Sequence, residues 1–179
     1  MAVFLALLRA MNVANTQLSM QDLRELLVGL GFTNVRSLLQ SGNLVFTAAA
    51  TGDTEVERRL EGELEKELGI RTDFFVRSPK EWRSLIDHNP FPDEAIKDPA
   101  HLVIMFLKDR PSAEAVRSLH DAIQGPERIH SAGREVYVVY PNGIGRSKLT
   151  GGLIERKLGT RGTARNWNTV QKMFALTTA

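Results

Sequence analysis

A loop containing two glycines and two cations is the segment of this sequence best suited to bind a ligand. It extends from Asn142 to Lys148, between a strand pattern and a helix pattern, and contains Gly143, Gly145 and Arg146. Glycines allow backbone N–H groups to converge ahead of a helix, and nearby Arg and Lys neutralise negative charge, which is the chemistry an anion requires. With a basic segment further on, the predicted ligand-binding residues are Gly143, Gly145, Arg146, Ser147, Lys148, Arg165 and Asn166.

The motif itself is weakly specific. The pattern GxxxxGK[ST] is absent, Ser147-Lys148 has the reverse order, and GxGxxG lacks its third glycine. Cations just before a helix oppose the helix dipole, so their placement is not explained by stability. The alternative is that Arg146 and Lys148 are solvated, that Asn166 caps a helix and that Trp167 anchors a core. The sequence leaves both interpretations open.

A second polar cluster is expected in the first half of the chain. If strands one and two of a βαββαβ unit end at the same edge, the loop after the first strand lies beside the following hairpin turn. The residues that would converge are Arg9, Asn12, Gln40, Ser41 and Asn43. Asn and Ser commonly bond turn backbone groups, and this structural interpretation is favoured over a ligand site.

Catalytic and metal-binding signatures are absent from the sequence. The four histidines are scattered, no HExxH or GxSxG occurs, and His120-Asp121 and His88-Asp87 are consecutive residues that do not face each other on a helix. No catalytic residue, metal or cofactor is therefore predicted, and whether the chain is an enzyme is left open.

Composition is that of an ordinary globular protein, with 42% hydrophobic and 25% charged residues in 179. Cysteine is absent, which excludes disulfides and thiolate chemistry and predicts a cytoplasmic protein. The apolar run Ala2 to Leu8 is too short for a membrane span and predicts a buried strand. Net charge is +2, but residues 141–179 contain seven basic residues and only Glu155 as an acid, so this part attracts anions.

The strands and helices that position these residues are predicted to occur in the same order in both halves of the chain. In the first half, strands are predicted at 3–8, 33–39, 43–47 and 70–76, with helices from Ser19, about Thr54 and Pro79. In the second half, strands are predicted at 101–107, 127–131, 135–140 and 163–165, with helices at 112–124, about 150–158 and from Asn166. Trp82 and Trp167 fall in corresponding third helices, which favours a diverged duplication.

This order predicts an α+β protein of two ferredoxin-like βαββαβ units, each with an antiparallel sheet of order 4-1-3-2 and a further helix. Prolines between Asn89 and Ala100 indicate a boundary. The expected domains are 1–92 and 101–179, joined by a linker at 93–100.

Long ordered motifs throughout the chain resemble a known bacterial family. They are Leu7-Leu8-Arg9 with Asn12-Val13, Gln40 to Phe46, Asn89-Pro90-Phe91, Gly145 to Leu149 and Thr163 to Val170. They are similar to the family designated domain of unknown function 1697, although this chain has Ala10, Ala14 and Asn15 in a loop where the family usually has glycines. The resemblance implies an architecture and no activity.

Three functions are compatible with these observations. The favoured one is a binding protein for a small anion bearing phosphate or carboxylate, with nucleotides included. The second is a weak nucleic-acid binder through the basic second half, although the stacking aromatics of RNP motifs are missing from 3–8 and 41–47, which contain only Phe4 and Phe46. The third is a homo-oligomeric interaction protein in which an exposed sheet edge or face of one unit pairs with another chain. No membrane partner is predicted.

Overall fold

The chain forms two compact units. The computed structural model describes residues 1–9, 12–13, 16–38, 42–50 and 52–178. The first unit comprises Met1–Ser84 with Lys172–Ala179, and the second comprises Leu85–Gln171. Each unit contains one four-stranded antiparallel sheet, so the prediction of a mixed α+β protein with two such sheets is confirmed.

The sheet of the first unit contains β1 (Ala2–Leu8), β4 (Thr33–Leu38), β5 (Asn43–Ala48) and β6 (Phe74–Arg77) in the order β4-β5-β1-β6. The fourth strand of the unit therefore pairs with the first, the first with the third and the third with the second, which is the predicted order. β1 is a central strand, because it pairs with β5 on one side and β6 on the other. Its consecutive residues Leu5, Ala6 and Leu7 have no exposed surface, so both faces of the strand are buried, which accounts for its continuous apolar sequence.

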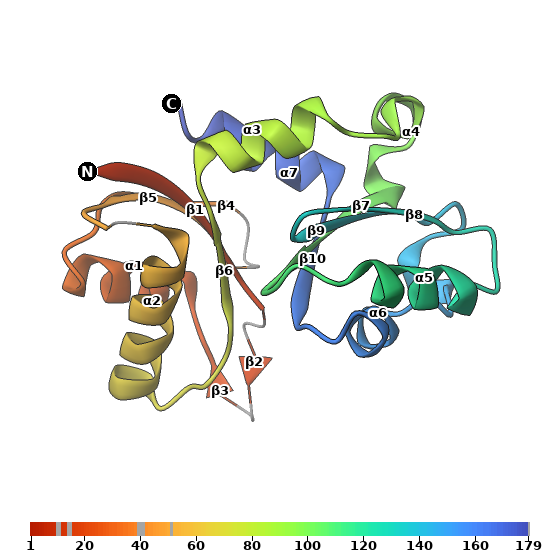
Figure 1. Cartoon of the computed structure of the whole chain (residues 1–179). Helices are drawn as coiled ribbons and strands as arrows, with labels where there is room; N and C mark the ends of the chain where they lie inside the picture. Colours follow the sequence, from red (N-terminus) through yellow and green to blue (C-terminus); the bar gives the residue numbers. More distant parts are fainter. Residues whose placement is uncertain (10–11, 14–15, 39–41, 51, 179) are drawn as a thin grey trace. The chain divides into compact units, whose positions relative to one another are not determined.

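Helices α1 (Met20–Gly29) and α2 (Asp53–Leu68) cover one face of this sheet (Figure 1). Alternate residues of β1, β5 and β6 meet the apolar stripes of both helices in one core that includes Leu23, Leu27, Leu60 and Leu64. Ser19 and Asp22 form a capping box, which satisfies N–H groups at the start of α1. Gly69 adopts φ +68° and ends α2, as its position after Leu68 predicts.

The sheet of the second unit repeats this arrangement with β7 (Leu102–Leu107), β8 (Arg128–Ala132), β9 (Glu135–Val139) and β10 (Gly162–Asn166) in the order β10-β7-β9-β8. Helices α5 (Ala113–Ala122) and α6 (Gly151–Leu158) pack on one face, around a core that includes Met105, Leu119, Val138 and Ile154. Thr150 caps α6 by accepting the Leu153 N–H at 3.2 Å.

A third helix follows the fourth strand of each unit and contains one tryptophan. These helices are α3 (Pro79–Asp87) and α7 (Trp167–Ala175). Trp82 has no exposed surface and Trp167 is 5% exposed, so both tryptophans are buried. Large aromatic side chains on the apolar stripe of an amphipathic helix are driven into the interior by the area they remove from water.

Several predicted boundaries differ from the structure. The predicted linker at 93–100 contains most of α4 (Pro92–Lys97) and the start of the 3-10 helix η1 (Pro99–His101), each with proline in its first turn. The predicted strand at 70–76 is restricted to β6, and the two-residue strands β2 (Asn12–Val13) and β3 (Thr16–Gln17) were not predicted. The compact units part inside α3 and α7, whereas the division into domains 1–92 and 101–179 stays a prediction.

Candidate functional site

The loop between β9 and α6 lines a surface cavity in the second unit. The cavity has a volume of about 290 Å³, and its other wall is the connection between α5 and β8. Four of the predicted ligand-binding residues line it, namely Gly143, Arg146, Ser147 and Lys148. The remaining lining residues are Gln124, Gly125, Pro126, Glu127 and Asn142.

The backbone of this loop is fixed by its own hydrogen bonds. The Tyr140 N–H donates to the His101 carbonyl at 2.9 Å, the Gly143 N–H to the Tyr140 carbonyl at 3.0 Å, and the Ser147 N–H to the Ile144 carbonyl at 3.2 Å. Gly143 adopts φ +83°, which favours glycine, and begins the 3-10 helix η2 (Ile144–Arg146). The Gly143 N–H therefore holds the loop together and does not point to a ligand, contrary to the expectation from sequence.

Arg146 and Lys148 carry the positive charge of this cavity. Both residues are exposed, and their side chains make no hydrogen bond or ion pair with any residue that the structure describes. The exposed Arg128, by contrast, pairs with Glu94 and lies 5.1 Å from the centre of the Phe91 ring. Two uncompensated cations on a fixed loop provide donors that an anion can reach without breaking an existing contact.

Glu127 opposes this charge and was missed by sequence reasoning. The Ser147 hydroxyl donates to Glu127 Oε1 at 2.5 Å and accepts the Leu149 N–H at 3.0 Å. A Cβ at position 125 would lie 2.5 Å from Glu127 Oε2, so the carboxylate lies against Gly125. Ser147 therefore positions the loop and holds Glu127, and the cavity has two cations and one carboxylate. The only local signal in the sequence is the Gly125-Pro126 turn that places Glu127 there.

Burial perturbs two tyrosines of this unit. The Tyr140 hydroxyl donates to the Leu149 carbonyl at 2.8 Å, and burial, followed by the charge of Glu127, raises the pKa of Tyr140 to about 12. The Tyr137 hydroxyl donates to the Leu85 carbonyl at 2.6 Å, and burial, followed by Glu135, raises the pKa of Tyr137 to about 12. The Tyr140 contact ties the far end of the loop to the end of β9.

These shifts give a testable alkaline titration, because the chain has two tyrosines in all. We expect the phenolate absorbance of the native protein to rise with a midpoint near pH 12, whereas the urea-unfolded chain should titrate near about pH 10. Since both folded-state pKa values are raised, this contribution to stability is present below about pH 10 and is lost as the pH rises toward 12. A native tyrosine that ionises near pH 10 would show that its hydroxyl is hydrated.

Arg165 and Asn166 are not brought to the cavity. Ala164 packs against the core under α5 and α6, so Arg165, the next residue of β10, points to the opposite face of the sheet, beside Ile104. Arg165 donates to Thr163 Oγ1 at 2.8 Å and to the Ala164 carbonyl at 2.9 Å, and burial lowers its pKa to about 10. Asn166 Oδ1 accepts the Thr169 N–H at 3.0 Å and caps α7. Both residues are engaged in structural contacts.

The predicted cluster of the first unit has a structural role where it can be described. Arg9 lies 3.5 Å from the carboxylate of Asp73 and donates its backbone N–H to the Asp73 carbonyl at 3.0 Å. Asn43 is fully buried and donates to the Leu38 carbonyl at 2.9 Å across the hairpin. The backbone of Asn12 forms part of β2, while Gln40 and Ser41 lie outside the described residues. The Asn43 side chain thus binds a backbone carbonyl, whereas the Arg9 side chain lies against a carboxylate.

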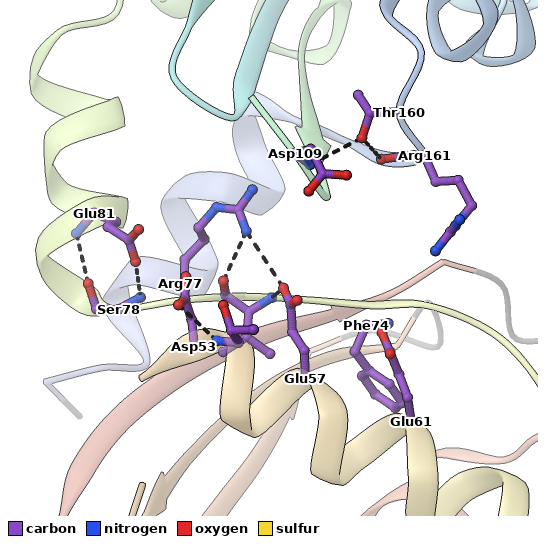
Figure 2. A network of polar contacts seen from close by, with 12 residues as sticks. Asp53, Glu57, Glu61, Phe74, Arg77, Ser78, Glu81, Asp109, Thr160 and Arg161 are labelled. Atoms are coloured by element: carbon purple, nitrogen blue, oxygen red, sulfur yellow. Dashed lines mark hydrogen bonds and ion pairs between the residues drawn. The ribbon is translucent and has the colours of Figure 1, made fainter. Parts of the chain in front are cut away.

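A buried polar network in the first unit was also missed by sequence reasoning (Figure 2). Glu57 and Glu61 of α2 accept the Val76 and Phe74 N–H groups of the edge strand β6, each at 2.9 Å. Arg77 has no exposed surface, lies 3.9 Å from Glu57 and donates to the Val76 carbonyl at 2.9 Å. Figure 2 shows Asp53 and Glu57 both pointing toward the Arg77 side chain.

The second unit has a corresponding contact between its second helix and its edge strand β10. Glu155 of α6 accepts the Gly162 N–H of β10 at 2.9 Å. In both units, therefore, a carboxylate from the second helix occupies N–H groups of the fourth strand. An added strand would need such groups, so these contacts disfavour pairing with another chain at β6 and β10.

In the ranges that the structure describes, no three His, Asp or Glu side chains are grouped so as to hold a metal ion. None of the helices in these ranges has the length and apolar character needed to cross a lipid bilayer.

Comparison with known proteins identifies a family and a fold. A family model described as a protein of unknown function, DUF1697, matches residues 1–137, which confirms the resemblance predicted from the motifs. A solved structure, that of a conserved bacterial protein from Streptococcus pneumoniae, has a TM-score of 0.74 at 18% identity and covers 97% of both chains. No curated protein matches. At this identity the solved structure establishes the fold alone.

Proposed function

We propose that this chain, which belongs to the DUF1697 family of proteins of unknown function, binds a small phosphate-bearing molecule in the cavity between the β9–α6 loop and the α5–β8 connection. The observation that carries the proposal is the exposed pair Arg146 and Lys148, whose side chains have no partner among the described residues. A guanidinium and an ammonium on one short loop suit the oxygens of a phosphate.

The size and charge of the cavity support a small ligand. Its volume of about 290 Å³ lies near the lower end of known ligand pockets, so a phosphate ester fits better than a dinucleotide. Glu127 reduces the excess positive charge to about one unit, which favours an anion of modest charge over a long polyanion. This argues for a small molecule over a nucleic acid.

Removing both cations tests the proposal. The double variant Arg146→Ala, Lys148→Ala should weaken binding of inorganic phosphate or ribose 5-phosphate by about a hundredfold or more, because hydrogen bonds to charged groups contribute about 1.5–3 kcal/mol each and every 1.4 kcal/mol is tenfold in affinity. Calorimetric titration measures the loss. Stability in urea should stay within about 0.5 kcal/mol of wild type, since both side chains are exposed.

The matched control is Arg156→Ala, Lys157→Ala, which removes the same charge from exposed positions of α6 outside the cavity. It should retain phosphate binding. If both double variants lose binding equally, a diffuse positive field holds the anion, and a salt-dependent affinity for oligonucleotides would then favour the nucleic-acid alternative. If the Arg146, Lys148 variant binds phosphate as wild type does, the cavity is not the site.

We also infer that the two units are ferredoxin-like repeats of one ancestral βαββαβ segment. Three features support this: the shared strand order, a tryptophan in the helix after the fourth strand, and a carboxylate from the second helix on that strand. The loop before α6 contains Arg146 and Lys148. Residues 49–52, before α2, contain no cation, and α2 itself begins with the acidic residues Asp53 and Glu55. The binding loop is then a specialisation of one repeat.

A further inference from the structure

A histidine fixed by a carboxylate lies beside the proposed binding loop. Asp98 follows α4 and His101 ends η1, and His101 Nδ1 is 2.8 Å from Asp98 Oδ2. The His101 N–H also donates to the Asp98 carbonyl at 3.1 Å, so backbone and side chain hold the pair together. The side chains of His101 and Asp98 are 42% and 48% exposed, so the pair lies at the surface of the unit.

That other nitrogen, Nε2, faces Gly143. A Cβ built on Gly143 would lie 3.6 Å from His101 Nε2, and the His101 carbonyl accepts the Tyr140 N–H at the start of the same loop. Gly143 lines the cavity together with Arg146 and Lys148. The imidazole does not itself line the cavity, but it lies directly behind Gly143, which does.

The Asp98 carboxylate determines whether Nε2 of His101 is a hydrogen-bond donor or an acceptor. An ionised Asp accepts hydrogen bonds and donates none, so it holds the proton of a neutral imidazole on Nδ1 and leaves Nε2 as an acceptor. An acceptor suits a hydroxyl group and repels a phosphate oxygen. Donors for an anion thus lie in the cavity on Arg146 and Lys148, and an acceptor for a hydroxyl lies next to the cavity, beside Gly143.

We propose that the ligand is a phosphate ester of a sugar or polyol, with its phosphate on Arg146 and Lys148 and a hydroxyl donated to His101 Nε2. This inference rests on the proposed function and specifies its substrate class. His101 is a binding residue in this arrangement, and Asp98 is a positioning residue that acts through the tautomer of the ring.

Calorimetric titration at about pH 8, where imidazole side chains are ordinarily neutral, tests the inference with two probes, inorganic phosphate and ribose 5-phosphate. Wild type should bind ribose 5-phosphate roughly two- to tenfold more tightly than phosphate, the equivalent of one hydrogen bond. His101→Phe retains a ring without an acceptor and should abolish this preference while leaving the dissociation constant for phosphate unchanged. Asp98→Asn should reduce the preference, because an amide N–H can favour the other tautomer.

The control is His130→Phe, which replaces an exposed histidine of β8 outside the cavity lining and should retain the preference. A wild-type protein that binds both probes equally, or a His101→Phe variant that keeps the preference, would overturn the inference and leave the anion site standing. A wild-type protein that binds neither probe overturns the proposed function and this inference together. Unchanged phosphate binding in His101→Phe also shows that the variant is folded.

Discussion

Replacing Trp82 by Ala should lower the free energy of unfolding by about 3–5 kcal/mol, the usual cost of removing a large buried aromatic side chain. Trp82 has no exposed surface and is held at the start of α3, where its backbone N–H donates to the Ser78 carbonyl at 3.0 Å. Ser78 and Glu81 close a reciprocal cap around the same turn, so the helix has little freedom to move into the space left behind. Urea denaturation followed by circular dichroism measures the change.

Lys80→Ala is the matched control, because Lys80 lies on the same helix and is exposed. It should change stability by less than about 0.5 kcal/mol. Trp167 is 5% exposed in the corresponding helix of the second unit, and Trp167→Ala should cost a similar amount. If either tryptophan variant is as stable as wild type, that side chain does not belong to a close-packed core. Each single variant keeps the other tryptophan as a fluorescence probe.

Local patterns predicted most of the secondary structure because the interactions that form each helix end or turn lie within the few residues of the pattern itself. The capping box at Ser19 satisfies N–H groups of α1 without any distant partner. Gly69 and Gly159 both adopt φ +68° directly after a helix, which their residue type anticipates. Strand order then follows from handed connections between elements whose sequence order is already known.

The buried Glu57 could not be recognised by the same reasoning. It lies in a helix rich in charged residues, and such a composition is typical of a solvated face. Its partners, the Val76 N–H and Arg77, are 19 and 20 residues further on, and which helix turn faces them depends on how α2 packs on the sheet. Periodicity identifies an apolar stripe but does not show which polar residues border it at an edge strand.

The candidate site was predicted in part for a related reason. The loop itself has a local signature, so Gly143, Arg146 and Lys148 could be selected from sequence. Arg165 was added because its strand ends at the same edge, but edge position does not specify the face to which a side chain points. The alternation between Ala164 and Arg165 decides that, and Ala164 faces the core. His101 and Glu127 come from other connections, and only the fold brings them to the loop.

The second large effect is expected for Glu57→Ala, which should lower the free energy of unfolding by about 1.5–3 kcal/mol because it removes a carboxylate 3.9 Å from the buried guanidinium of Arg77, which Asp53 also faces. The same change removes the acceptor of the Val76 N–H on the edge strand β6. Equilibrium unfolding in urea measures the loss. Glu57→Gln keeps an oxygen for the Val76 N–H, so the difference between the Ala and Gln variants separates the lost hydrogen bond from the lost charge.

Two further variants separate charge burial from a general effect of helix substitution. Glu61→Ala removes a carboxylate one turn further along α2 that accepts the Phe74 N–H at a less buried position, and it should cost about 0.5–1.5 kcal/mol. The double variant Glu57→Leu, Arg77→Met removes the charges of both residues and should recover part of the stability lost in Glu57→Ala, because well-packed apolar residues often replace a buried ion pair, while the Val76 N–H still lacks its acceptor on Glu57. If Glu57→Ala costs no more than Glu61→Ala, Arg77 finds other compensation in the folded chain. The pair would then be a dispensable part of the β6 edge, and the Glu57 carboxylate would act only as an acceptor for the Val76 N–H.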